Sequence, residues 1–438
     1  MKLAHLSTLS IAVIMASSAQ GNAFVEDASL DIHLRNYFKG NSYKNDQQME
    51  DSHSQWAQAV RLNFSSGYLV NLVGVDLGAQ HSLKIRGDKN SDNGLLHPDS
   101  NGNADGYGKT SYALKINLFD MGVAKYGRLF IDTPLLSDSD SRALTSLTEG
   151  FYAEGQYDAL GLYGVIAIER NFVTTSGFQK FGNMNANNEF KNESVNIIGG
   201  TYDFGHGLTT HLAYGKQKNT EKRYLADVKY STNLQAVGLD FGVQYAKNTV
   251  IGDQRTENQS SGTTDSSQHT WGAMGTAHIG AVSIGVAYTA VQKTQLNDFD
   301  FEWSVRNPGE EGSVGDEGNY FGYNAVQYSD FNKGGQKAWG LNASYNLNDM
   351  IEGLSVYGAY VTGKVRRQDD NGDNLSAWTE KEYNLGLSYY LPMIEGLSAH
   401  LMYAYNTEKD QGENDSGDTT DLINKDTRVI VKYDIAVF

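Results

Sequence analysis

The residues best placed to do chemistry in this sequence are basic side chains within segments where apolar and polar residues alternate. In such a segment the apolar residues occupy every second position, as Leu30, Ile32 and Leu34 do, and the cation lies on the other phase. The two phases of a β-strand point to opposite faces, so we expect these cations to share one face. A row of cations could guide anionic or hydrogen-bonding groups along that face. The candidates are Arg35, Arg61, Lys84, Lys115 and Arg428.

A second group of candidates lies in one charged segment with the sequence DTPLLSDSDSR. Its charged members are Asp132, Asp138, Asp140 and Arg142. Opposite charges that face each other across a narrow gap produce a transverse field, which orients dipolar solutes and filters them by charge. Pro134 stiffens the beginning of the segment, and the pair Leu135–Leu136 favours contact with protein over contact with water.

Signals for enzymatic catalysis are absent from the sequence. With no cysteine, the chain has no thiol nucleophile, no thiolate zinc site and no disulfide. It contains neither an H-E-x-x-H nor a G-x-S-x-G motif, and its ten histidines are scattered. Gly108-Lys109-Thr110 is similar to the end of a phosphate-binding loop, but Asn103 stands where that loop needs glycine. We therefore predict no catalytic site, no cofactor and no metal site.

The elements that position these residues are predicted to be β-strands. Eighteen alternating segments lie between residues 29 and 437, and no segment keeps a helical period over three turns. The stretch from Ser266 to Gln292 carries no charge and is long enough for a membrane helix. Its four glycines favour a hairpin that turns at Gly280 instead.

The connections between these segments alternate strictly between short and long. We count eight short ones and nine long ones, including those near 250–268, 294–335, 364–380 and 408–424. Outer-membrane barrels have tight turns at one rim and long polar loops at the other. In a closed barrel only the lipid-facing half of each strand must be apolar, which suits a chain with 39% hydrophobic residues. The prediction is an all-β, antiparallel, up-and-down transmembrane barrel of about 18 strands, with short periplasmic turns and long extracellular loops.

Charge and the first residues narrow the setting further. The 438 residues carry a formal charge of −17, which argues against nucleic acid as a partner. Met1-Lys2, the apolar run from Leu9 to Ala16 and the small residues after it are typical of a secretory signal. Cleavage is expected after Ala19 or, preferably, Ala23. The predicted organisation is a signal peptide over 1–23 and one barrel domain over 24–438.

Several blocks of the sequence resemble one known family. They are Phe24–Leu30 with Leu34–Phe38, Asn324–Phe331 with Gly335–Trp339, the ending Asp426–Tyr433, and the spacing of Gly127, Pro134-Leu135, Arg142 and Gly150. On these blocks the sequence is identified as a member of the OprD family of substrate-selective outer-membrane porins. The resemblance implies an eighteen-stranded barrel whose third long loop, here 131–147, folds inward. It also implies a ladder of wall cations that face acidic or carbonyl groups on that loop.

The family resemblance leaves the solute open. Known members carry basic amino acids, small carboxylates or, in the chitoporin branch, chitin oligosaccharides. Members that handle carboxylates usually have arginines on the next-to-last strand, but here that strand, 399–407, has none. The constriction loop also carries three aspartates. The missing arginines and these aspartates together weaken the case for an anionic substrate.

The expected function is passive, substrate-selective diffusion of small hydrophilic solutes across the outer membrane. The alternatives are a barrel enzyme, such as a protease or phospholipase, and a non-conducting structural or adhesive barrel. Expected partners are outer-membrane lipid, lipopolysaccharide and the barrel-assembly machinery, which would read the terminal Phe438. Because Phe438 is out of phase with Val431 and Tyr433, we also expect a bulge near Asp434.

Overall fold

The computed structural model describes most of the chain. The described residues are 22–45, 50–87, 93–98, 103–185, 189–296, 298–300, 302–307, 313–315, 322–365, 377–413 and 419–438. Residues 1–21 of the predicted signal peptide lie outside these ranges, and so does the segment 366–376. No helix within these ranges is long and apolar enough to cross a membrane.

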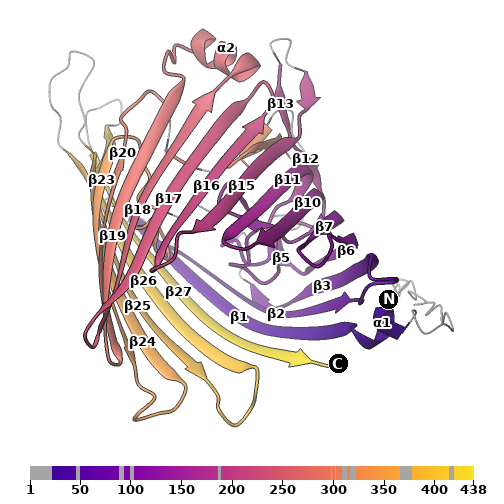
Figure 1. The fold of residues 1–438 in the computed structure, drawn as a ribbon. Coiled ribbons are helices and arrows are strands. Elements are labelled where there is room, and N and C mark those ends of the chain that lie inside the picture. The colour runs from indigo at the N-terminus through magenta and orange to yellow at the C-terminus, as the bar shows by residue number, and fades with distance from the viewer. Residues whose placement is uncertain are drawn as a thin grey trace.

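The fold is a single antiparallel β-barrel (Figure 1). One sheet holds 19 strands. The two-residue β12 only pairs with the last residues of β11, so the other 18 strands make the wall. The wall strands are β1 Ser29–Asn45, β2 Glu50–Ser65, β3 Val73–Gly87, β6 Tyr107–Asn117, β7 Gly122–Leu129, β10 Leu147–Tyr157, β11 Leu160–Asn171, β15 Val195–Asp203, β16 Leu208–Gln217, β17 Glu221–Leu234, β18 Val237–Val250, β19 Ser267–Ile279, β20 Val282–Val291, β23 Gln336–Asn346, β24 Leu354–Val365, β25 Trp378–Tyr390, β26 Leu397–Glu413 and β27 Thr419–Ala436.

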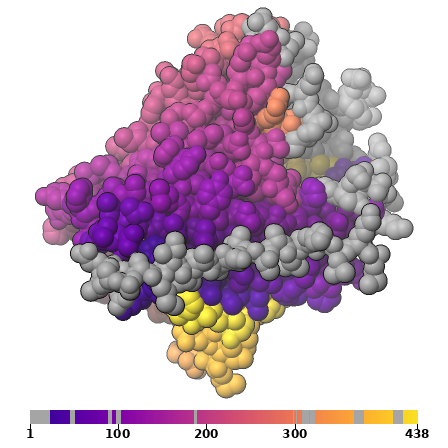
Figure 2. All heavy atoms as spheres, turned by 90° about the vertical axis from the view of Figure 1, so that its right-hand side faces the viewer, coloured from indigo at the N-terminus to yellow at the C-terminus, as the bar shows by residue number. Residues whose placement is uncertain are grey.

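The sheet closes because the first strand pairs with the last. β1 pairs with β27 from Asp31 opposite Ala436 to Asn45 opposite Leu422. Figure 2 shows the result, with the indigo N-terminal strands directly beside the yellow C-terminal ones. The predicted eighteen-stranded barrel is therefore confirmed.

The remaining elements are short and belong to the loops. They are α1 Asn22–Glu26, β4 His97–Pro98, β5 Ala104–Asp105, β8 Asp132–Thr133, β9 Leu136–Ser137, β12 Gln179–Lys180, β13 Gly182–Met184, β14 Phe190–Asn192, α2 Gly252–Ser260, β21 Ser304–Arg306 and β22 Ser313–Gly315. The uncharged stretch forms the hairpin of β19 and β20, and Gly280 turns it with a φ of +56°. Glycine accepts this left-handed conformation without steric cost.

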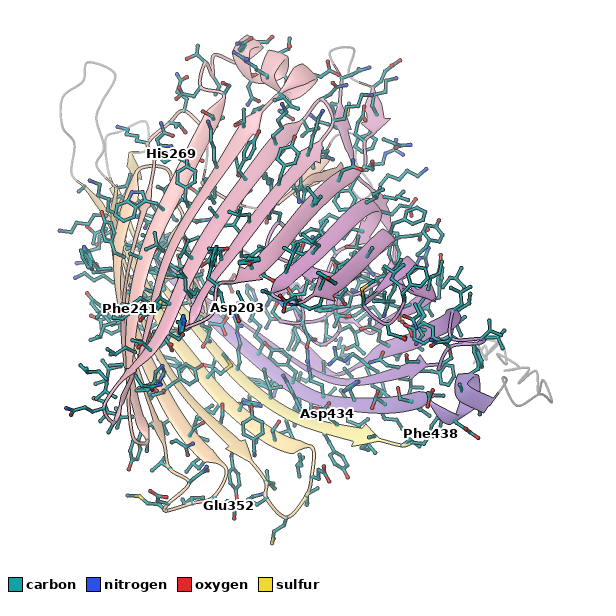
Figure 3. The ribbon with its side chains drawn as sticks, in the orientation of Figure 1. Asp203, Phe241, His269, Glu352, Asp434 and Phe438 are labelled. Carbon is teal, nitrogen blue, oxygen red and sulfur yellow. The ribbon has the colours of Figure 1, made fainter. Side chains whose placement is uncertain are left out.

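Short turns gather at one rim, where Figure 3 labels Glu352 in the turn between β24 and its neighbour β23. Left-handed backbone is concentrated there, at residues such as Asp158, Gln235 and Gly353. The other rim carries the long connections and α2. The wall follows the predicted alternation, since Leu62, Leu114 and Ile198 are exposed on the outside while their neighbours in sequence face inward.

Two details of the wall differ from what an unbroken alternation of residues along each strand predicts. A bulge in the β2–β3 pairing places Lys84 opposite Ala57 but Arg86 opposite Trp56, so Arg86 faces outward although it shares the phase of Lys84 in the sequence. The expected bulge at Asp434 is wrong, because the pairing of β27 with β1 runs without a shift to Ala436. Beyond Ala436 both Val437 and Phe438 bond to Leu30 of β1, since the Val437 N–H donates to the Leu30 carbonyl oxygen at 2.8 Å and the Leu30 N–H donates to the Phe438 carbonyl oxygen at 3.2 Å. The regular strand phase therefore ends just before Phe438.

The wall is lowest where β7 stands. β7 has 8 residues, whereas β27 has 18. After Leu129 the chain therefore leaves the wall, and residues 130–146, called the inner loop below, run along the inner face before β10 begins.

Gly127 on β7 tests how closely neighbouring strands of the wall approach each other. Its φ is +152°, and an added Cβ would lie 1.9 Å from the carbonyl oxygen of Tyr112 on β6. We expect Gly127→Ala to lower the yield of folded barrel, because the strain costs about 1–3 kcal/mol. The matched control is Gly164→Ala on β11, where the nearest atom would lie 3.7 Å from the new Cβ. Refolding yield, read from heat-modifiable migration on gels, should fall only for Gly127→Ala, and equal yields would contradict the argument.

Candidate functional site

The inner loop is fixed to the barrel by two apolar contacts. Ile131, Leu135 and Leu136 are buried in a cluster with Phe181, Phe299 and Trp303 from the long loops. At the other end of the inner loop, a second cluster buries it against the loop before β6 and the wall. Its members include Ala143, Leu144, Leu95, Leu96, Tyr37 and Ala57. The apolar pair singled out in the sequence thus contacts protein.

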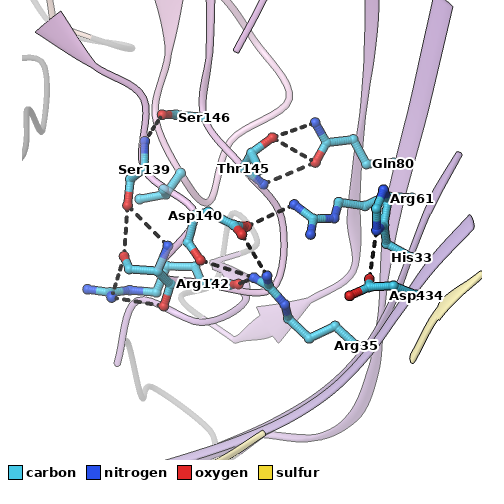
Figure 4. A network of polar contacts seen from close by, with 12 residues as sticks. His33, Arg35, Arg61, Gln80, Ser139, Asp140, Arg142, Thr145, Ser146 and Asp434 are labelled. Carbon is cyan, nitrogen blue, oxygen red and sulfur yellow. Dashed lines mark hydrogen bonds and ion pairs between the residues drawn. The ribbon is translucent and has the colours of Figure 1, made fainter. Parts of the chain in front are cut away.

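Asp140 is the centre of the polar contacts between the inner loop and the wall (Figure 4). Its Oδ2 accepts a hydrogen bond from Nη2 of Arg35 at 2.8 Å, and its Oδ1 accepts one from Nη1 of Arg61 at 2.8 Å. Nη1 of Arg35 also donates to the carbonyl oxygens of Asp140 and Arg142. Arg35 and Arg61 come from adjacent strands, β1 and β2, and both lie on the inward phase. The predicted pairing of wall cations with loop acid and carbonyl groups is present at these two positions.

Burial and charge act against each other on Asp140. Partial burial alone would raise the pKa of its carboxyl group, but the adjacent guanidinium groups of Arg35 and Arg61 hold the pKa below its usual range. The carboxylate therefore stays charged at neutral pH, and the contact is an ion pair.

Other wall side chains hold the rest of the inner loop. Gln80 and Thr145 exchange hydrogen bonds, with Nε2 of Gln80 donating to Oγ1 at 2.7 Å and the Thr145 N–H donating to Oε1 at 3.0 Å. Lys109 donates to the carbonyl oxygen of Thr145 at 2.8 Å. The hydroxyl group of Tyr37 donates to the carbonyl oxygen of Ser141 at 3.2 Å. The loop conformation is thus fixed at several points by the wall.

The other predicted loop residues have different surroundings. Asp138 is buried, accepts hydrogen bonds from the Ile131 N–H and from Thr148, and lies 3.3 Å from Nε of Arg170 on β11. Asp132 is exposed and accepts one hydrogen bond, from Ser137. The guanidinium group of Arg142 donates to Ser141.

The remaining predicted wall cations do not contact the inner loop. Lys115 pairs with Asp76 at 2.9 Å and donates to Ser65 at 2.6 Å, near the short-turn rim. Lys84 donates to the carbonyl oxygen of Ala104. Arg428 pairs with Asp426 at 2.8 Å and donates to the carbonyl oxygen of Gln327. These contacts lie apart from the Asp140 cluster.

The wall cations predicted from the sequence leave out several inward cations, among them Lys39, Lys109, Lys125, Arg170, Arg223 and Lys432. Lys125 on β7 pairs with Asp76 at 2.7 Å, and Arg170 joins Asp138. Lys432 lies opposite Arg35 in the β1–β27 register. Within the part of the chain that the structure describes, Lys432 forms no ion pair or side-chain hydrogen bond. Lys432 could have been predicted from the sequence as a wall cation, because it lies on the same strand phase as Arg428.

An acidic surface lies next to this basic wall. Glu380 and Glu382 on β25 and Glu408 on β26 are buried and face inward. Both carboxylate oxygens of Glu382 accept hydrogen bonds, from the N–H groups of Tyr328 and Ser329 at 2.9 Å each. The block around residues 324–331 is therefore folded onto the inner wall.

A cavity of 620 Å³ lies between the inner loop and the wall strands β1 to β10. Its lining includes five carboxylates against three permanent cations. They are Asp31, Asp76, Asp132, Asp140 and Glu154, against Arg61, Lys125 and Arg128. Among the described residues no three acidic or histidine side chains converge as a metal site would require. The cavity can bind a small solute through charge and hydrogen bonds.

Comparisons with known proteins agree with this architecture. The model of a family described as outer membrane porin, OprD family, matches residues 22–437. Porin D of Pseudomonas aeruginosa is 25% identical over 97% of this chain and 94% of its own. The porin-like protein GalP of Pseudomonas putida is 23% identical over 81% of this chain and 83% of its own.

Solved structures share the fold over nearly the whole chain. Pseudomonas aeruginosa OpdK, solved with vanillate, aligns with a TM-score of 0.75 and 21% identity, covering 94% of this chain and 100% of that one. Pseudomonas aeruginosa OccK9 aligns with a TM-score of 0.77 and 19% identity, covering 95% of this chain and 100% of that one.

Asp140→Asn tests the contact that fixes the loop. We expect faster amide hydrogen exchange over residues 139–146, because the Arg35 guanidinium would lose its charged partner while buried. In the wild type the ion pair contributes fully above about pH 4 and is lost only as the pH falls through the lowered pKa of Asp140. Exchange, corrected for the intrinsic pH effect, should therefore be equal at pH 5 and pH 7.

The control is Asp132→Asn, which removes the same charge from an exposed site in the same loop. Equal exchange in both variants would show that Asp140 does not hold the loop.

Proposed function

Because this chain belongs to the OprD family of outer membrane porins, a family of substrate-selective channels for small solutes, we propose that its own solutes are small molecules with both a carboxylate and a cationic group. Basic amino acids are the simplest solutes of this kind. The observation that supports this is that three carboxylates lining the 620 Å³ cavity, those of Asp31, Asp132 and Glu154, have no ion-pair partner among the described residues, whereas Asp76 and Asp140 are already paired with cations. A cavity with this bias attracts cations and repels simple anions.

The cavity offers partners for both ends of such a solute. Asp132 and Glu154 each accept one neutral hydrogen bond, from Ser137 and Tyr152, and form no ion pair within the described ranges. They can therefore accept a solute ammonium group. Arg61 and the nearby uncommitted Lys432 can bind the solute carboxylate.

Arg35 has a different proposed role from the one that the sequence indicated. It is 3% exposed, and its guanidinium group already donates to Asp140 and to two loop carbonyl groups. We propose that Arg35 positions the inner loop and does not itself contact the solute.

The alternatives to a channel are separated by simple measurements. Among the described histidines, His33 pairs with Asp434, whereas His278 contacts the Ser283 hydroxyl group through Nδ1 and the Asp240 carboxylate through Nε2, at 2.8 Å each. This Ser–His–Asp contact is the feature that a test for hydrolysis must address. We propose that the protein has no hydrolytic activity, which a protease or phospholipase assay on pure protein would overturn. Planar-bilayer recording without discrete conductance steps would support the non-conducting barrel. We also propose that Phe438, which is 65% exposed just after the end of β27, is recognised by the barrel-assembly machinery.

Charge removal in the cavity tests the proposed selectivity. The double variant Asp132→Asn, Glu154→Gln should slow uptake of lysine and arginine relative to succinate, by about tenfold, since two carboxylates no longer attract the ammonium group. The measurement is liposome swelling with matched panels of basic amino acids, small carboxylates and N-acetylglucosamine oligomers.

The matched control is Asp253→Asn, Glu257→Gln, two acids of α2 at the outer rim, where no residue is buried. It removes the same charge and should leave the ratio unchanged. Succinate uptake faster than lysine uptake in the wild type would contradict the proposed solute class, while any reproducible uptake would still support a channel.

We further propose that the inner loop sets the size limit of the pore. An eighteen-stranded barrel leaves a wide lumen unless something fills it. Deleting residues 135–145 removes both apolar contacts of the loop, so we expect higher single-channel conductance and passage of larger sugars. Deleting residues 255–261, in and just after α2, serves as the control and should change neither. Unchanged conductance in the folded 135–145 deletion would place the constriction elsewhere.

A further inference from the structure

The outer face of the wall carries a row of lysines near the long-loop rim. On strands β16 to β26, each of these lysines lies on the same phase as exposed apolar residues of its strand, as Lys216 does with Leu212 and Lys381 with Leu385. Pairing registers place them on one face of the sheet. The row, called the lysine belt, consists of Lys216, Lys222, Lys247, Lys337, Lys364, Lys381 and Lys409.

Along the strands, the lysine belt lies next to a row of aromatic side chains, on the side of the long-loop rim. Tyr214 and Tyr224 pack with ring centroids 5.1 Å apart, as do Tyr288 and Trp339 at 4.6 Å and Tyr360 and Tyr383 at 4.8 Å. In Figure 3, His269 of the same outward face lies near the upper end of the wall, and Phe241 lies lower on it.

Within single strands, Lys216 follows Tyr214 by two residues, and Lys381 precedes Tyr383 by two. Two residues span about 6.6 Å along a strand. Aromatic rows mark the membrane–water interface of such barrels, so the belt lies at the level of the outer-leaflet head groups.

The belt contains charge repulsion that no acidic side chain of the described residues neutralises. Lys216 lies directly opposite Lys222, and Lys337 lies directly opposite Lys364. Like charges at directly opposed positions of a sheet destabilise the pair. The outward positions of β16 to β26, as far as the structure describes them, hold no aspartate or glutamate, and no belt lysine forms an ion pair there. An anion between the paired lysines would remove this repulsion.

An apolar groove begins at the end of the belt. It has a volume of 1190 Å³ and extends from Lys216 past Tyr214, Ile198, Ile166 and Phe151 on the outer face. The ligand of the belt would therefore combine phosphate-like charge with hydrocarbon chains. A free inorganic anion has no hydrocarbon chain that could fill the apolar groove.

We propose that the lysine belt binds the phosphate groups of the lipid A part of lipopolysaccharide, with an acyl chain in the groove below Lys216. Lysine binds phosphate as a compact point charge, and its long apolar stem can lie along the aromatic row while the ammonium group reaches the head groups. The belt runs along β16 to β26, and Lys425 on the neighbouring β27 lies on the same outward face opposite Tyr405, so the glycolipid would bind along this side of the wall. This inference rests on the outer-membrane location of the chain and not on the proposed solute.

The test compares two four-site variants of the full chain. The belt variant is Lys216→Gln, Lys222→Gln, Lys337→Gln and Lys364→Gln, and the control is Lys180→Gln, Lys191→Gln, Lys229→Gln and Lys293→Gln. Native mass spectrometry from detergent measures retention of diphosphoryl lipid A. We expect the belt variant to bind at least about tenfold more weakly than the wild type and the control to bind like the wild type.

Three further arms decide between explanations. Dephosphorylated lipid A should bind the wild type about as weakly as diphosphoryl lipid A binds the belt variant, and equal binding of the two lipids by the wild type would overturn phosphate recognition. Inorganic phosphate at equal concentration should not displace the lipid, and complete displacement would overturn the lipid as ligand. Replacing the same four lysines with arginine keeps the charge and should keep binding.

If the four-site glutamine variant does not fold, the double variant Lys337→Gln, Lys364→Gln is tested for lipid A retention in its place.

Discussion

Every backbone hydrogen-bonding group inside the hydrocarbon layer must have a partner within the protein, and the closed ladder of 18 strands satisfies this constraint. The pairing of β1 with β27 completes the ladder. Once the wall is closed, side chains alternate between lipid and lumen, so the polar half of each strand must face inward. The inner surface is therefore rich in charge, and the loops that fold inward meet partners for both their apolar and their charged residues.

Most of these inward charges are used to build the pore. Arg35 is almost completely buried, and burial of a cation is tolerated only when acceptors replace its water. Asp140 and two loop carbonyl groups supply them. Arg170 with Asp138 and Glu382 with the N–H groups of residues 328 and 329 are further examples. In the proposed function, selectivity comes from the charges that form no ion pair among the described residues, such as Asp132, Glu154 and Lys432.

The sequence was sufficient to predict the fold, because period-two alternation and the order of short and long connections follow directly from bilayer physics. It also placed Arg35, Arg61 and Asp140 correctly on the wall and the inner loop, where the structure joins them. The directions of other charged side chains could not be predicted, because β-bulges interrupt the alternation. The shift at Trp56/Ala57 turns Arg86 outward, and the shift at Glu149/Gly150 places Arg170 opposite Thr148, where it reaches Asp138. Neither shift has a signature in alternation alone. Loop contacts such as that of Gln327 with Asp426 join residues far apart in the chain and have no local signal.

Charge is also sorted across the wall itself, and this sorting specifies the register. On β25 the consecutive residues Glu380, Lys381 and Glu382 point inward, outward and inward, and on β26 Glu408 points inward beside the outward Lys409. A slip by one residue reverses every side chain of a strand. It would place both glutamates of β25 against lipid and move Lys381 away from the head groups. A misplaced charge on the lipid face costs up to about 2–4 kcal/mol for lysine at mid-membrane, less for glutamate and less near the interface. Several such charges act together, so the same pattern that gives the mouth of the pore its acidic inner surface also excludes the alternative pairings of these long strands.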